Sequence, residues 1–224
     1  MSKINEIDTP SRRFRALSCA LLLMTSPSLL ADYEDGVNAA LNGDYDTALH
    51  EFTLAAEEGL DLAQYNLGIL YYTGQGVNQD VAEAFRWTEA AALQGHVAAQ
   101  FNLGSLYFSG DGVAADEDKA VEMFELAAWG GHANAALILA NMYADGEMMP
   151  DANPGVLARL SAYLSTFFPS SDDNSDLVLA HAWANIALAN ESTEADALLA
   201  KLQGRMSKGQ LSQARRQFAQ WQIQ

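Results

Sequence analysis

Cysteine is nearly absent from the sequence, which is 224 residues long and contains only Cys19. Because Cys19 lies in a segment that we interpret below as an export signal, the rest of the chain cannot form an internal disulfide bond. That remainder is long and rich in alanine, leucine and aromatic residues, so the packing of a hydrophobic core must stabilise it.

Positive charge is also scarce. The chain has 12 lysines and arginines against 29 aspartates and glutamates, which gives a formal charge of −17 at pH 7. A nucleic acid or an anionic membrane would require clustered basic side chains, so we expect neither as a partner. The acidity has two interpretations that the sequence leaves open: it keeps an exported protein soluble, or it attracts a basic protein or peptide.

Hydrophobic runs long enough to span a bilayer are missing. The longest apolar stretch, residues 16–30, is interrupted by serines and a proline, and it follows the basic pair Arg12-Arg13. This pattern predicts a signal peptide over 1–31 that is cleaved near Ala31 and leaves a periplasmic or secreted protein without membrane insertion. An uncleaved anchor is the alternative, and the choice between general secretory and twin-arginine export stays open.

The chain is rich in internal similarity. Residues 63–77 read AQYNLGILYYTGQGV and residues 99–113 read AQFNLGSLYFSGDGV, with ten of fifteen positions identical at an offset of 36. A catalytic pocket is built once, whereas a stacking unit is built many times. The sequence therefore predicts a protein of stacked structural repeats.

Each copy predicts a hairpin of two helices. In the earlier copy Leu67 and Leu70 recur at helical spacing, and Gly74 and Gly76 can then adopt positive φ and reverse the chain. Asp80 is a residue type that favours a helix N-terminus, so we expect the second helix to begin there.

Small residues extend the alignment to neighbouring units. The positions that recur every 36 residues are Ala48, Ala84 and Ala120, then Gly59, Gly95 and Gly131, then Ala63, Ala99 and Ala135. A shorter first helix is expected from about Tyr33 to Leu41, so the repeats cover 32–146. The register breaks at Gly146, and Met149 stands where the repeat has valine.

An insertion and a helical cap are expected beyond this break. Residues 147–175 contain prolines around one amphipathic helical stripe, and the repeat pattern resumes at Ala180 and Trp183. Residues 176–224 then predict the last repeat helix and two further amphipathic helices, which form a C-terminal cap. Whether the interrupted hairpin still packs like the others is open at this stage.

The chain resembles proteins built from Sel1-like repeats, relatives of the tetratricopeptide repeat, in the stretch AQYNLGILYYTGQGVNQDVAEAFRWTEAAALQGH. The repeat pattern is A-x-x-x-L-G-x-x-Y-x-x-G-x-G-V, followed by A-x-x-W-x-x-x-A-A-x-x-G-H. The closing segments AHAWANIALAN and RMSKGQLSQARRQFAQW are similar to the C-terminal cap of many exported bacterial members. The resemblance implies an all-α fold, a right-handed α-solenoid of antiparallel helix hairpins in 36-residue repeats with a C-terminal helical cap.

Residues that could catalyse a reaction or hold a metal do not form a recognisable set. His96 and His132 occupy the same repeat position after a glycine, which favours a structural role in the turn. His50 and His181 have no histidine or cysteine at metal-ligand spacing, and motifs for a catalytic nucleophile or a nucleotide loop are missing. We therefore expect no enzyme activity, no cofactor and no metal.

The candidate partner-binding residues are the variable positions on the first helix of each hairpin, because these positions line the concave face of a superhelix of hairpins. Asparagine side chains there can donate to and accept from an extended peptide backbone. The candidates are Asn66, Ile69, Thr73, Asn102, Ser105, Ser109, Ile138, Asn141 and Asp145. Merely exposed polar positions are the alternative, and the inserted apolar stripe of 147–175 is a second candidate surface.

One functional hypothesis and two alternatives follow. The resemblance implies a non-catalytic scaffold or adaptor of the bacterial cell envelope that binds a protein or peptide on its concave face. A cell-wall-acting or antibiotic-binding enzyme is disfavoured, because such relatives carry paired cysteines in every repeat. A self-assembling structural subunit is the other alternative, since the oligomeric state is open.

Overall fold

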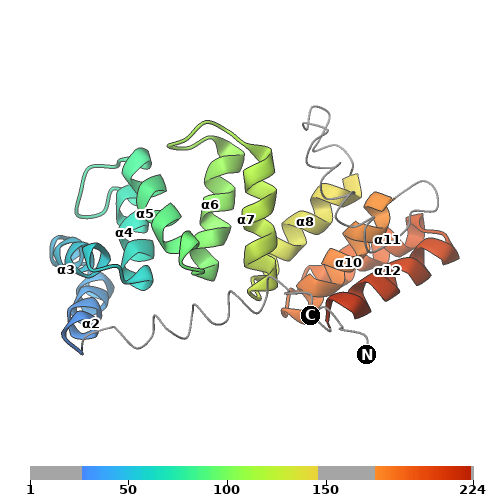
Figure 1. The fold of residues 1–224 in the computed structure, drawn as a ribbon, viewed down its shortest axis with the longest axis horizontal. Helices are drawn as coiled ribbons and strands as arrows, with labels where there is room; N and C mark the ends of the chain where they lie inside the picture. Colours follow the sequence, from blue (N-terminus) through green and yellow to red (C-terminus); the bar gives the residue numbers. More distant parts are fainter. Residues whose placement is uncertain (1–26, 146–174, 223–224) are drawn as a thin grey trace, which may run out of the picture. The chain divides into compact units, whose positions relative to one another are not determined.

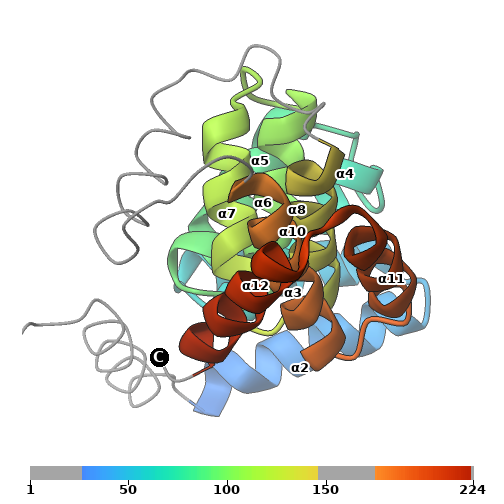
Figure 2. The same ribbon diagram turned by 90° about the vertical axis from the view of Figure 1, so that its right-hand side faces the viewer.

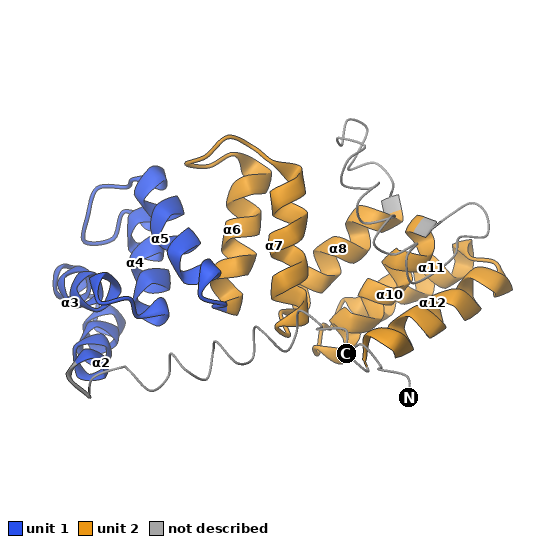
Figure 3. Ribbon diagram, in the orientation of Figure 1, with its two compact units in different colours: residues 1–96, 224 blue, residues 97–223 orange. Residues whose placement is uncertain are grey.

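The computed structural model describes residues 27–145 and 175–222, and every regular element in these two ranges is an α-helix (Figure 1). The helices are α2 (Pro27–Leu41), α3 (Tyr45–Glu57), α4 (Asp61–Thr73), α5 (Val81–Leu93), α6 (Val97–Ser109), α7 (Glu117–Trp129), α8 (Ala133–Asp145), α10 (Ser175–Ala189), α11 (Ala195–Arg205) and α12 (Lys208–Trp221). They divide into two compact units, which we call the N-terminal unit (α2–α5) and the C-terminal unit (α6–α12) (Figure 3).

The repeat register that the sequence predicts is confirmed. Helices α4, α6 and α8 begin 36 residues apart, and so do α5 and α7. The turn glycines Gly74 and Gly76 have φ of 72° and 71°, and their counterparts Gly110 and Gly112 have 77° and 74°. Glycine is favoured at these positions because a side chain at positive φ clashes with the backbone.

The N-terminal unit packs each helix against its successor, and small residues let the helices approach closely. Its core contains Ala48, Phe52, Ala55 and Leu67, all of which are buried. At Gly68 an added Cβ would lie 2.7 Å from the Thr88 hydroxyl, so the contact between α4 and α5 requires glycine there. The small residues that repeat in the sequence are therefore packing positions.

Two helices of the C-terminal unit complete the interrupted hairpin. Helix α8 ends at Asp145 and α10 begins at Ser175, yet these two helices pack directly against each other. Helix α10 in turn packs against α11 and α12, which form the cap (Figure 2). The fourth hairpin is thus completed by helices from either side of the insertion.

The first helix is longer than the sequence predicts. It begins at Pro27 and not at about Tyr33, because proline suits a first helical turn and Leu29 packs with Tyr33 against the core. The predicted cleavage near Ala31 falls within α2 and stays a prediction. The rest of the predicted signal peptide, and the predicted insertion up to residue 174, lie outside the described residues. Among the described helices, none combines the length and apolarity needed to cross a bilayer.

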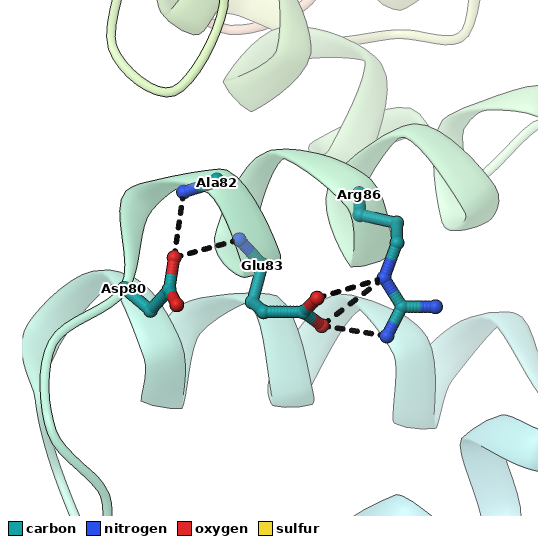
Figure 4. Close-up of polar contacts among 4 residues, drawn as sticks. All are labelled: Asp80, Ala82, Glu83 and Arg86. Carbon is teal, nitrogen blue, oxygen red and sulfur yellow. Dashed lines mark hydrogen bonds and ion pairs between the residues drawn. The ribbon is translucent and has the colours of Figure 1, made fainter.

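A side-chain cap defines where α5, the second helix of its hairpin, begins. The Asp80 carboxylate accepts hydrogen bonds from the Ala82 and Glu83 amides at 3.0 and 3.1 Å, as Figure 4 shows. Glu83 itself forms a surface ion pair with Arg86, 2.6 Å between Oε2 and Nη2. The prediction that Asp80 caps this helix is confirmed.

These two contacts should differ in their contribution to stability. Asp80→Ala removes both cap hydrogen bonds and is expected to lower the free energy of unfolding by about 1 kcal/mol. Glu83→Gln breaks an exposed ion pair and should change it by about 0.5 kcal/mol or less. Urea unfolding measures both, and Asp80→Asn, which keeps the acceptor, is the matched control. A loss with Glu83→Gln as large as that with Asp80→Ala would contradict this account.

Candidate functional site

In the N-terminal unit, the predicted binding residues lie on α4. The half-buried Asn66 side-chain amide donates to the Tyr33 hydroxyl of α2 at 3.1 Å, so it joins the first helices of two successive hairpins. Burial raises the pKa of Tyr33 above its ordinary value, and its hydroxyl therefore stays neutral. Ile69 is half-buried, and the exposed Thr73 hydroxyl donates to the Ile69 carbonyl at 2.8 Å.

In the C-terminal unit, α6 carries the equivalent residues. The Ser105 hydroxyl donates to the Phe101 carbonyl at 3.1 Å, and the Ser109 hydroxyl lies 2.9 Å from the Asp111 carboxylate. Asn102 occupies the position of Asn66 and is half-buried, but its amide forms no hydrogen bond with another described residue. Its donors and acceptor are thus available to a partner.

Helix α8 carries the last three candidates. Ile138 is half-buried, while Asn141 is exposed and its amide donates to the Leu137 carbonyl at 2.9 Å. Asp145 is the final residue of the helix. The side-chain donors of Asn141, Thr73 and Ser105 bond their own helices, which reduces their capacity to bind a partner and makes Asn102 the strongest candidate.

Two histidines have a repeated structural contact that the sequence did not reveal. The ring of His96 stacks on Tyr65 with centroids 4.5 Å apart, and that of His132 stacks on Phe101 at 4.2 Å. Burial lowers the pKa of both histidines, so they are neutral near pH 7. Tyr65 and Phe101 are 36 residues apart, as are His96 and His132, so the repeat spacing could have indicated both contacts. The contacts agree with the structural role predicted for the two histidines.

A third histidine, His181, lies in a polar cluster where α10 meets the cap helix α11. The residue is 2% exposed, and amide groups face both ring nitrogens: Asn185 Nδ2 is 2.9 Å from Nδ1 and Gln203 Nε2 is 3.4 Å from Nε2. Burial, and to a smaller extent the charge of Arg215, lowers its pKa. The described residues contain no group of three acidic, histidine or cysteine side chains that could hold a metal ion.

Three tryptophans form a cluster that sequence reasoning missed. The centroids of Trp129 and Trp183 are 5.1 Å apart, those of Trp183 and Trp221 4.8 Å, and those of Trp129 and Trp221 5.2 Å. They come from α7, α10 and α12, and while Trp183 is buried, Trp129 is 47% exposed. The sequence shows each of the three tryptophans as a large side chain, but its periodicity does not predict which helices bring the rings together.

The first helices of the hairpins carry amides and hydroxyls, groups that can exchange hydrogen bonds with a peptide backbone. Sequence comparison then assigns the repeats: a model of the Sel1 repeat matches residues 61–96 and 97–132. No curated protein matches the sequence.

Two solved structures resemble this one. A Sel1 repeat protein from Oxalobacter formigenes superposes with a TM-score of 0.50 at 23% identity, over 83% of this chain and 84% of that chain. A protective antigen of uropathogenic Escherichia coli with an SLR fold superposes with a TM-score of 0.51 at 25% identity, over 86% of this chain. The chain spans only 46% of the length of that second structure.

These likenesses support the predicted fold class, an all-α arrangement of helix hairpins. Proteins with such repeats are generally scaffolds for protein–protein interaction and are typically non-catalytic. The two matched repeats occupy consecutive 36-residue segments, each of which contains one complete hairpin of the structure. Residues 61–132 of the chain therefore consist of two Sel1 repeats.

Proposed function

We propose that this protein is a non-catalytic scaffold or adaptor of the bacterial cell envelope, which binds a protein or peptide segment through the first helices of the hairpins in its C-terminal unit, α6 and α8. The envelope location rests on the predicted signal peptide. The binding role rests on the matched Sel1 repeats and on the polar side chains of these helices.

The observation that carries the proposal is the half-buried amide of Asn102. The equivalent residue, Asn66, bonds Tyr33, whereas Asn102 has no hydrogen-bond partner among the described residues. The Asn102 amide is therefore left to bond water in the free protein, and an extended peptide backbone would supply both a donor and an acceptor to it. Asn102 is therefore expected to be the main polar contact to the bound segment.

The test compares single variants of the chain from residue 27 onward. Envelope extract is passed over the wild-type protein, the retained partner is identified by mass spectrometry, and its dissociation constant is measured with purified components. Asn102→Ala should weaken binding about tenfold, which corresponds to about 1.4 kcal/mol. Asn141→Ala should have a smaller effect, because that amide already bonds the Leu137 carbonyl.

The matched control is Asn78→Ala, which alters an exposed asparagine in the loop before α5. It should bind the partner like the wild-type protein. Equal affinity of the Asn102→Ala and Asn78→Ala variants would exclude the first-helix surface as the binding site. Failure of the wild-type protein to retain any envelope protein would reject the scaffold role itself.

A further inference from the structure

The charge of the chain changes sign near its C-terminus. Residues 201–224 contain five basic side chains and not a single aspartate or glutamate. Between residues 32 and 200 the sequence has 27 acidic side chains and only three basic ones. The formal charge of −17 therefore conceals a concentrated positive region in the cap.

The described helices of the cap present these charges to solvent. The five basic residues, all exposed on α11 and α12, are Lys201, Arg205, Lys208, Arg215 and Arg216. Within the described part of the chain, Lys208, Arg215 and Arg216 form no ion pair with a carboxylate. Their charges are thus not neutralised by the fold.

The aromatic side chains at the end of α12 face away from these charges. Helical spacing places Trp221 on the side of the buried Ala214 and Gln217, where it makes an edge-to-face contact with Trp129. Arginine is enriched in protein–protein interfaces, where its guanidinium supplies a directed charge. We call Lys208, Arg215 and Arg216 the basic cap surface.

We propose that the basic cap surface binds an acidic segment of a partner protein, one that is rich in aspartate or glutamate. A guanidinium binds a carboxylate through paired hydrogen bonds, and the three exposed cations lie on one helix without a carboxylate of their own. The surface differs from the first-helix surface proposed above, so the protein has two separate sites for partners.

The strong acidity of the rest of the chain makes this site selective. Charges farther apart than about 8 Å are largely screened at physiological ionic strength, so the local positive field attracts the segment at close range. Elsewhere on the molecule the acidic side chains repel it, which confines it to the cap. An anionic lipid surface fits less well, because α12 already buries Ala214 and Gln217 and packs against α10, so this helix is not free to insert.

The test uses two labelled peptides and fluorescence anisotropy. One is rich in glutamate, and the other has glutamine in place of every glutamate. The wild-type protein should bind the glutamate peptide, with an affinity that falls as salt is added, and should bind the glutamine peptide at least about tenfold more weakly. Equal affinity for the two peptides would overturn the proposal.

Charge-reversal variants locate the site. Lys208→Glu/Arg216→Glu should reduce the affinity for the glutamate peptide at least about tenfold. The control, Arg86→Glu/Lys119→Glu, makes the same charge change at exposed residues of α5 and α7 and should bind like the wild-type protein. Equal losses in both variants would show that only the total charge matters and would reject the site.

Further variants protect the test against misfolding and against other occupants. Arg215→Gln and Arg216→Gln should each weaken binding while the helical circular dichroism spectrum is unchanged. Tighter binding of anionic vesicles than of the peptide would overturn the proposal in favour of a lipid surface. The mass of the wild-type protein in solution tests the last alternative. If this mass rises with concentration and that of the Lys208→Glu/Arg216→Glu variant does not, the surface binds a second copy of the chain and the proposal is overturned.

Discussion

Glu125→Gln is expected to stabilise the protein by about 2 kcal/mol at pH 8 and to have almost no effect at pH 4. Glu125 lies on α7 and is only partly accessible to water. Burial raises the pKa of Glu125 to about 7 from an ordinary value near 4.5, and the charge of Glu122 adds to the effect. The ionised carboxylate is therefore unfavourable in the folded protein, and glutamine removes it while it keeps the shape.

The direction of the pH dependence follows from proton binding. Between about pH 4.5 and pH 7 the folded state holds the Glu125 proton while the unfolded state has released it. The contribution of the protonated Glu125 to stability is thus fully present below about pH 4.5 and is lost as the pH rises through about 7. Urea unfolding of the two proteins at a series of pH values should show curves that meet near pH 4 and diverge up to pH 8.

The neighbouring Glu122→Gln variant is the control. Glu122 is exposed and contributes the smaller part of the pKa shift, so its replacement should stabilise the protein at pH 8 by much less than Glu125→Gln. A constant difference between the Glu125→Gln variant and the wild-type protein at every pH would show that the carboxylate is not the cause.

Gly76→Ala is expected to cost the N-terminal unit at least about 3 kcal/mol, the sum of backbone strain and overpacking. Gly76 has a φ of 71°, where a side chain is unfavourable. A Cβ atom there would also overlap the carbonyl group of Tyr45, which begins α3. The clash involves backbone, so no side-chain rotation can relieve it.

Gly43→Ala separates the two contributions. Gly43 has a similar φ of 78°, but an added Cβ would meet no atom within 4 Å. This variant should lose only the strain, about 1 kcal/mol. Thermal unfolding followed by circular dichroism measures both. If the two variants melt together, the turn at Gly76 does not pack against α3 as described.

Much of the fold could be predicted because the sequence repeats. The similarity between residues 63–77 and 99–113 fixes a common register, and the starts of α4, α6 and α8 follow from this register. The positive φ of Gly74 and Gly76 was predictable for the same reason, since paired glycines after a helical pattern are typical of tight turns. Local rules and periodicity agree in these segments.

The contacts that the sequence did not predict depend on partners distant in the chain. Periodicity places Tyr65 on a helix face but does not say that His96 stacks on it. A count of charge cannot show that Glu125 is shielded from water, because burial depends on packing around α7. The first-helix residues were located on the predicted helices, yet only the hydrogen bonds distinguish Asn102 from Asn66. The composition of residues 201–224 shows the positive charge of the cap, but the strongly negative charge of the whole chain conceals it.

The direct packing of α8 on α10 has a consequence for how such a chain changes during evolution. Both ends of the intervening sequence are held at one apex of a hairpin, where its length hardly affects the free energy: doubling a loop costs only about 0.6 kcal/mol in closure entropy. New sequence can therefore be acquired, exchanged or lost at this apex while the periodic framework on either side is retained. The interrupted hairpin is thus a position at which a protein of such helical repeats can diversify.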